Sequence, residues 1–138
     1  MKNRVLKIIK CSFLLFFVSN SCRNDAGEPA TPRADCVIDT IPVVSFSKNI
    51  IPIFNSYCTD AGCHSGTNPA AKLSLEATVA YSQLMKKGTG YVNIQDPGYS
   101  ILYSEMNSTS DPMPPTGRLD ACTIALVYKW IQQQAKNN

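Results

Sequence analysis

The chain has 138 residues, of which 44% are hydrophobic and 17% are charged, and six are cysteines. Its formal net charge of +3 comes from the first 21 residues, which hold four of the 13 basic residues and none of the 10 acidic residues. The remainder has nine basic and ten acidic residues, a formal charge of −1, and no cluster of lysine or arginine. Nucleic-acid binding depends on neutralising phosphates, so this balance excludes nucleic acid as a partner.

The first 21 residues have the layout of a secretory signal peptide. Lys2, Arg4, Lys7 and Lys10 precede an apolar run over residues 11–18, and small and polar residues follow. The run is too short to span a bilayer comfortably, and no other stretch is long and apolar enough. We therefore expect an exported protein whose mature part is soluble apart from any anchor.

Residues 18–22 read Val-Ser-Asn-Ser-Cys and resemble the lipobox of bacterial lipoproteins. The resemblance implies that Cys22 is lipidated and becomes the mature N-terminus, so the membrane is reached through an N-terminal lipid anchor only. Ordinary signal cleavage near Ser21 is the alternative. Residues 22–40 are rich in Pro, Ala and small polar residues, which predicts a flexible tether and leaves residues 41–138 as one small domain.

Helical spacing of apolar residues predicts a helix that leads directly into Cys58. Ser45 or Ser47 can cap its start. Pro52 removes a backbone donor, so the helix either begins near residue 50 or bends there. The residues that share the apolar face are Phe46, Ile50, Ile53, Phe54 and Tyr57.

The rest of the domain alternates loops with predicted helices. A loop over residues 65–69 precedes a helix over 75–87, which Gly88 would stop. A turn at 96–100 opens a short helix through Met106, and the proline-rich stretch 107–118 is an extended loop. Asp120 caps a last helix through Lys136, whose apolar face holds Ile124, Val127, Tyr128, Ile131 and Ala135.

Cys58, Cys63 and His64 belong to the sequence Cys-Thr-Asp-Ala-Gly-Cys-His, a C-x4-C-H element that contains the single histidine of the chain. The usual haem-attachment signature is C-x-x-C-H, in which two thiols add to the haem vinyl groups and the adjacent imidazole binds the iron. The spacing here is two residues longer, a less common variant of that signature. Gly62 would give the longer loop the freedom to bring both sulfurs to the ring.

The order of these segments is similar to that of the monohaem c-type cytochrome domains of bacterial envelope lipoproteins. Three segments carry the resemblance: Ile-Ile-Pro-Ile-Phe over residues 50–54, Met113-Pro114-Pro115, and Trp130-Ile131 in the last helix. The resemblance as a whole covers about residues 46–135. The resemblance implies an all-α fold, a small cytochrome-c-like helical domain packed around one covalent haem c.

The resemblance also implies a set of haem ligands. Cys58 and Cys63 would form thioethers, His64 would be the proximal iron ligand and Met113 the distal one. Met85 and Met106 lie in amphipathic segments, where a core position is expected. A thioether sixth ligand closes the iron site and favours electron transfer over oxygen chemistry. The implied function is therefore an electron carrier and not an enzyme.

The partners implied are envelope redox proteins that act as electron donor and acceptor. The implied location is the cell envelope, with the domain in the periplasm or at the outer membrane. A haem enzyme would need an open sixth site, and Met113 counts against it.

Two cysteines remain once the haem pair and Cys22 are assigned and Cys11 is removed with the signal. These are Cys36 and Cys122, and two leftover cysteines in an exported protein suggest one disulfide. It would join the end of the tether to the start of the last helix. The alternative is mispairing with the haem cysteines when haem is absent.

The C-x4-C-H element also has readings without haem. Cys58 and Cys63 can form an ordinary disulfide in an oxidising compartment, with His64 a surface residue. A zinc site would need a fourth ligand besides these three. The alternative function is therefore a haemless, disulfide-stapled envelope lipoprotein domain with a binding or structural role.

Overall fold

The computed structural model describes residues 36–138. The predicted signal peptide, the predicted lipidation site at Cys22 and residues 22–35 of the predicted tether lie outside the described residues.

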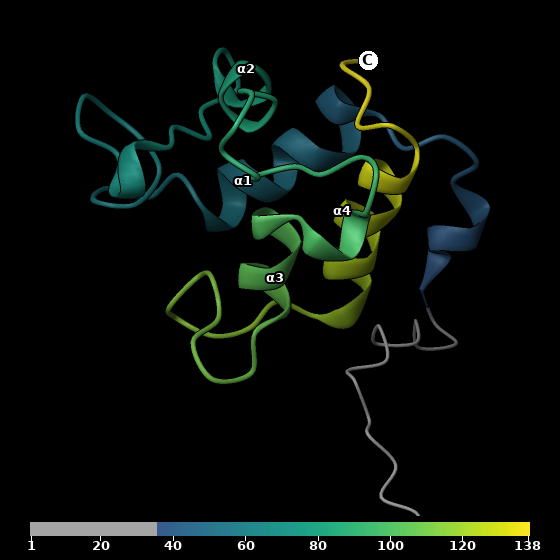
Figure 1. Ribbon diagram of the computed structural model, residues 1–138. Helices are drawn as coiled ribbons and strands as arrows, with labels where there is room; N and C mark the ends of the chain where they lie inside the picture. Colours follow the sequence, from purple (N-terminus) through teal and green to yellow (C-terminus); the bar gives the residue numbers. More distant parts are fainter. Residues whose placement is uncertain (1–35) are drawn as a thin grey trace, which may run out of the picture.

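The described part of the chain is helical and contains no strand, which confirms the all-α prediction at that level. Its α helices are short and are joined by 3-10 or π segments and by long loops (Figure 1). The α helices are α1 Ile51–Tyr57, α2 Ala80–Leu84, α3 Ile101–Asn107 and α4 Ala121–Gln132. The other helical segments are η1 Val37–Thr40, η2 Phe46–Ile50, η3 Ala70–Lys72 and η4 Pro97–Tyr99.

The helix predicted before Cys58 is present as two consecutive segments, the π-helix η2 and then α1. The Ser45 hydroxyl accepts a hydrogen bond from the Lys48 N–H at 3.2 Å, so Ser45 is the N-cap. Pro52 falls in the first turn of α1, where its missing N–H costs no helical hydrogen bond. The change from π to α geometry falls next to Pro52, and α1 begins at Ile51, close to the start near residue 50 that the sequence predicted.

The apolar face of this segment is buried apart from its last residue. Phe46, Ile50, Ile53 and Phe54 are at most 9% exposed, whereas Tyr57 is 44% exposed. The prediction that Tyr57 joins the same buried face is therefore wrong. Tyr57 is the last residue of α1, and the core that buries Phe54 one turn earlier does not extend over it.

Helix α2 is much shorter than the predicted helix over 75–87. The reason lies before it, where the Leu75 N–H donates to the His64 carbonyl at 2.8 Å and the Leu73 carbonyl contacts the His64 ring at 3.1 Å. These two contacts keep residues 73–75 in a non-helical conformation. Leu73 and Leu75 are both buried. Gly88 has a φ of +80°, but it lies beyond the helix, which already ends at Leu84.

The second half of the domain follows the predicted order of elements. The turn after Asp96 forms η4 and opens α3, and residues 108–120 contain neither helix nor strand. Asp120 caps α4 as predicted, because its Oδ1 accepts from the Thr123 N–H at 2.9 Å and its Oδ2 from the Thr123 hydroxyl at 2.6 Å.

Helix α4 ends at Gln132 and not at Lys136 as predicted. Gln134 and Ala135 have φ values of +71° and +44°, which reverse the chain. The Trp130 indole N–H then donates to the Lys136 carbonyl at 3.0 Å, which satisfies the polar atom of a fully buried ring. Ala135 is nevertheless fully buried, as its place on the predicted face required.

The core lies between α4 and the η2–α1 segment. Phe46 is at its centre, with ring centroids 5.1 Å from Trp130, 5.3 Å from Tyr81 and 6.3 Å from Phe54. Aromatic contacts at these separations add about 0.5–1.5 kcal/mol each to the burial of the rings. This cluster joins α4, α2 and the segment that leads into Cys58.

The segment before η2 is also fixed to the end of the chain by polar contacts. The Gln133 side chain accepts from the Val44 N–H and donates to the Pro42 carbonyl, each at 2.8 Å. Asn138 accepts from the Phe46 N–H through its side chain and from the Ser47 N–H through its carbonyl, each at 2.9 Å. Hydrogen bonds to the backbone therefore fix the start of the helical segment that leads into Cys58, in addition to the packing of its apolar face.

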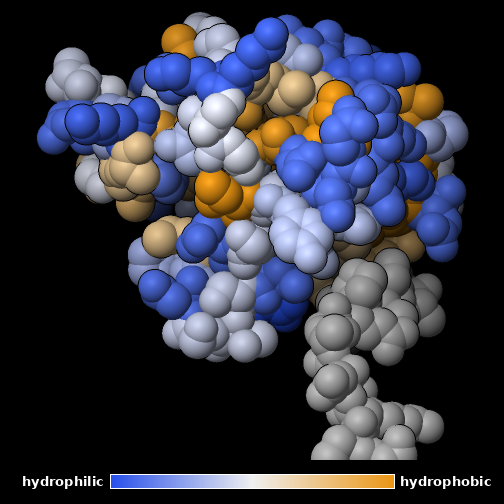
Figure 2. Space-filling view, viewed as in Figure 1, coloured by the Kyte–Doolittle hydropathy of each residue, from blue (hydrophilic) through white to orange (hydrophobic). Residues whose placement is uncertain are grey.

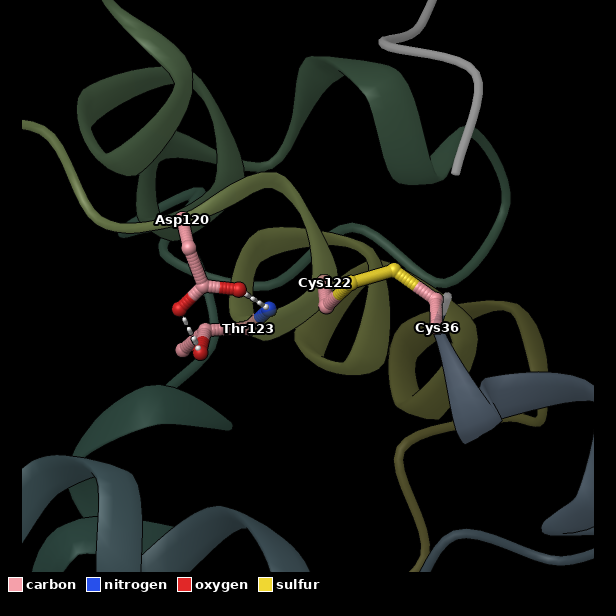
Figure 3. Close-up of a disulfide and its surroundings, with 4 residues drawn as sticks. All are labelled: Cys36, Asp120, Cys122 and Thr123. Atoms are coloured by element: carbon pink, nitrogen blue, oxygen red, sulfur yellow. Dashed lines mark hydrogen bonds between the residues drawn. A yellow bond between two sulfur atoms is a disulfide. The ribbon is translucent and has the colours of Figure 1, made fainter. Parts of the chain in front are cut away.

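Cys36 and Cys122 form a disulfide, as predicted, with their Cα atoms 5.5 Å apart (Figure 3). The Lys129 ammonium also donates to the Ile38 carbonyl at 2.8 Å, and Ile38 is 8% exposed. The last residues of the predicted tether, from Cys36 onward, therefore contact α4 and belong to the folded domain.

Removal of this disulfide should lower the free energy of unfolding. The bridge links residues 86 positions apart, and a disulfide typically stabilises a fold by about 2–4 kcal/mol. We expect urea unfolding of the Cys36→Ser, Cys122→Ser double variant to give a free energy of unfolding that is lower by that amount. Parent protein treated with dithiothreitol is the control and should match the variant; equal stability of oxidised parent and variant would contradict the structural role.

Replacing the cap of α4 should cost a smaller and pH-dependent amount. The hydrogen bond from the Thr123 hydroxyl lowers the pKa of Asp120 below its ordinary value of 3.8. The charged Asp120 cap therefore contributes its full stabilisation above the pKa that Asp120 has in the unfolded chain. That stabilisation is lost as the pH falls through the lower pKa that Asp120 has in the folded chain. We expect Asp120→Ala to cost about 1 kcal/mol at neutral pH, and less below that window, in urea unfolding.

Asp120→Asn provides the matched control, because asparagine also caps helices but does not titrate. The stability of the Asp120→Asn variant relative to the parent should rise as the pH falls, because the Asp120 carboxylate of the parent then becomes protonated. A cost for Asp120→Ala that stayed constant down to the acid limit of folding would show that the charge contributes nothing.

Candidate functional site

The end of α1 positions Cys58. The Cys58 N–H donates to the Phe54 carbonyl at 2.8 Å, which continues the helical hydrogen bonding by one residue. The side chain is half-buried and packs against the hydrophobic core. The first cysteine of the C-x4-C-H element is therefore attached to a helix that packs in the hydrophobic core.

A tight turn brings the second cysteine and the histidine back to this helix end. The Cys63 N–H donates to the Asp60 carbonyl at 2.9 Å, and Gly62 inside the turn has a φ of +85°. This left-handed conformation favours glycine, as the sequence suggested. The His64 N–H then donates to the Cys58 carbonyl at 2.9 Å, so the three residues form one hydrogen-bonded unit.

The His64 ring is oriented by the backbone of Leu73. Its Nδ1 lies 3.1 Å from the Leu73 carbonyl oxygen. A carbonyl can only accept, so this bond places a proton on Nδ1 and leaves Nε2 of the neutral ring as the acceptor. A histidine that binds a metal through one nitrogen commonly has the other nitrogen fixed in this way.

Both cysteines of the element are free thiols and half-buried. Burial, with smaller contributions from the nearby Cys63 and Asp60, raises the pKa of the Cys58 thiol to about 11. Cys58 is thus a neutral thiol at neutral pH. The chain places its disulfide between Cys36 and Cys122 and leaves this pair available for other chemistry.

Met113 differs from the other two methionines of the domain. It is 36% exposed, whereas Met106 is 3% exposed and Met85 packs against the core, as predicted for both. The Met113 N–H donates to the Glu105 carbonyl of α3 at 3.0 Å, which fixes this part of the proline-rich loop to the helix. Among residues 36–138, Met113 has the most accessible thioether.

The loop with His64 and the loop with Met113 project to the same side of the helical core (Figure 1). Tyr91 connects them indirectly: its hydroxyl donates to the Ala71 carbonyl at 3.5 Å, and its own carbonyl accepts from the Leu102 N–H of α3 at 3.0 Å. In the space-filling view separate hydrophobic residues reach the surface among hydrophilic ones (Figure 2).

No group of three or more His, Cys, Asp or Glu side chains in the described range is arranged to hold a metal ion. None of the helices over residues 36–138 is long and apolar enough to cross a membrane. Comparison of the chain with protein-family models, with curated proteins and with solved structures finds no match.

Two contributors to the site were not predicted, the Leu73 carbonyl and Tyr91. Leu73 lies nine residues after His64, between the loop predicted over residues 65–69 and the helix predicted over 75–87. The alternation Leu73-Ser74-Leu75 is a period of two, which is typical of extended backbone and was the available signal. Tyr91 has no comparable signal, because its role depends on the position of α3.

The raised pKa of Cys58 should make this thiol slow to react. In the folded Cys63→Ser variant Cys58 is the only free thiol of the described domain, and we expect iodoacetamide to modify it at about pH 8 at least tenfold more slowly than in urea. Mass spectrometry of quenched samples measures the rate. The Cys58→Ser variant, which leaves Cys63 free, is the comparison; equal rates folded and unfolded would rule out burial of Cys58.

Proposed function

We propose that the domain is a c-type cytochrome that transfers electrons in the cell envelope. Cys58 and Cys63 would hold one haem c covalently, with His64 and Met113 as its axial ligands. Envelope redox proteins would be its electron donor and acceptor, and a lipid on Cys22 would attach the protein to the membrane. The observation that carries the proposal is the Nδ1 contact of His64 with the Leu73 carbonyl, within a unit that presents two free thiols.

The thiols fit the covalent chemistry that the proposal requires. Each thiol would add its S–H across a vinyl double bond, so that an S–C bond forms and the proton goes to the adjacent carbon. No electron is lost in this addition, but the cysteines must be reduced. Cys58 and Cys63 are both free, and the neutral state of Cys58 protects it from disulfide exchange, which needs the thiolate.

The two iron ligands fit their expected roles. The Leu73 carbonyl holds the His64 ring with Nε2 as its free electron-pair donor. The accessible thioether of Met113 lies in a loop on the same side of the core. When bound, the haem supplies one-electron redox chemistry at its iron, and a methionine ligand raises its potential.

The fit favours an electron carrier over the alternatives. A disulfide between Cys58 and Cys63 would consume the two thiols that the structure leaves free, and the staple of this domain is the other pair. Ligation by Met113 would close the sixth position of the iron, which an oxygen- or peroxide-dependent enzyme needs open.

An absorption spectrum tests the proposal directly. We expect the protein, exported in a host with a c-type haem maturation system, to carry haem that survives a denaturing gel and to show a sharp alpha band after reduction with dithionite. Replacing both Cys58 and Cys63 by serine should abolish haem staining of the gel. Met113→Ala should keep the covalent haem but lose the weak band at the red end of the oxidised spectrum.

Met85→Leu is the matched control for Met113→Ala, because Met85 packs against the core and should leave the spectrum unchanged. A colourless protein of apo mass, produced beside a properly loaded control cytochrome from the same host, would overturn the haem proposal.

A further inference from the structure

The backbone hydrogen bond from His64 to Cys58 joins the histidine to the first cysteine, as would be expected in the shorter C-x-x-C-H motif. In an α helix each N–H donates to the carbonyl four residues earlier. In a helical C-x-x-C-H element the histidine is four residues after the first cysteine, so its N–H would donate to that carbonyl. His64 is six residues after Cys58, and its N–H nevertheless donates to the Cys58 carbonyl at 2.9 Å.

The two additional residues are taken up by the turn that precedes Cys63. The bond from the Cys63 N–H to the Asp60 carbonyl closes this turn, and its left-handed residue is Gly62. Asp60, Ala61 and Gly62 are all exposed, and a Cβ built on Gly62 would meet no atom within 4 Å. The additional length therefore points away from the domain, and no contact of the core depends on it.

We propose that this turn is an insertion that leaves the Cys58–His64 framework equivalent to that of C-x-x-C-H. Deletion of Ala61 and Gly62 would keep the hydrogen bond between His64 and Cys58 as an ordinary helical one. In consequence, the spacing of the cysteines matters to the enzyme that attaches the haem and not to the haem itself. The part of this inference that concerns haem rests on the proposed function, whereas the part that concerns the backbone does not.

Hydrogen exchange in the haem-free domain tests the backbone part. We expect the His64 amide to be protected to the same degree, within about threefold, in the parent and in the chain that lacks Ala61 and Gly62. Gly62→Ala is the matched control, because it keeps the spacing but strains a residue at a φ of +85°. It should reduce protection of the His64 amide about tenfold. Loss of that protection in a shortened chain that still unfolds cooperatively would overturn the inference, as would a shortened chain that fails to fold while Gly62→Ala folds.

The haem part is tested without any attaching enzyme. Reduced parent and shortened chains are each mixed with haem, and thioether formation is followed by mass and by the reduced absorption spectrum. Equal yields and superimposable spectra support the inference, and a spectrum or yield that changes with spacing overturns it. If neither chain takes up haem, the parent also stays colourless in the host with a maturation system, and both chains protect the His64 amide equally, the proposed function fails and the structural equivalence stands.

Discussion

Packing of the η2–α1 segment against α4 is the contact on which the rest of the structure depends. Phe46 and Trp130 meet at its centre, and both rings are almost fully buried. No described helix exceeds 12 residues, a length at which isolated helices are marginal in water, so these helices need tertiary contacts to persist. The aromatic cluster supplies the largest of those contacts.

The candidate site is built outward from this packed pair. Helix α1 ends at the cysteine that begins the C-x4-C-H element, and the carbonyl of that cysteine anchors His64. The His64 carbonyl and ring then hold the backbone of residues 73–75, whose leucines return to the core. A disturbance of the aromatic cluster would thus reach the orientation of the His64 ring through few intermediate contacts.

Features set by local chemistry could be predicted from the sequence. Ser45 and Asp120 are caps that stand directly before apolar helical patterns, and Pro52 marks the first turn of α1. Gly62 was identified from the need for a flexible loop, and its φ of +85° agrees. In each case the residue and its partner lie within four positions or the residue fixes its own backbone, so no tertiary information is needed.

Features set by distant contacts could not be predicted. The length of α2 depends on hydrogen bonds that His64 makes with residues 73–75, and the end of α4 depends on the indole of Trp130 reaching the Lys136 carbonyl. Composition favours a longer helix at both places, but the tertiary hydrogen bonds outweigh a propensity of a few tenths of a kcal/mol per residue. The ligand set itself, including Met113, came from a resemblance and remains a prediction.

The two cysteine pairs are distinguished by their surroundings more than by their spacing. Cys36 and Cys122 are brought together by the packing of η1 on α4, where Lys129 holds the Ile38 carbonyl, so their bridge reinforces an existing contact. Cys58 is instead kept protonated by burial, which slows its reaction as a thiolate. Oxidising conditions would therefore close the first pair more readily than the second, and this difference lets one small domain hold both a structural disulfide and a reduced pair of thiols.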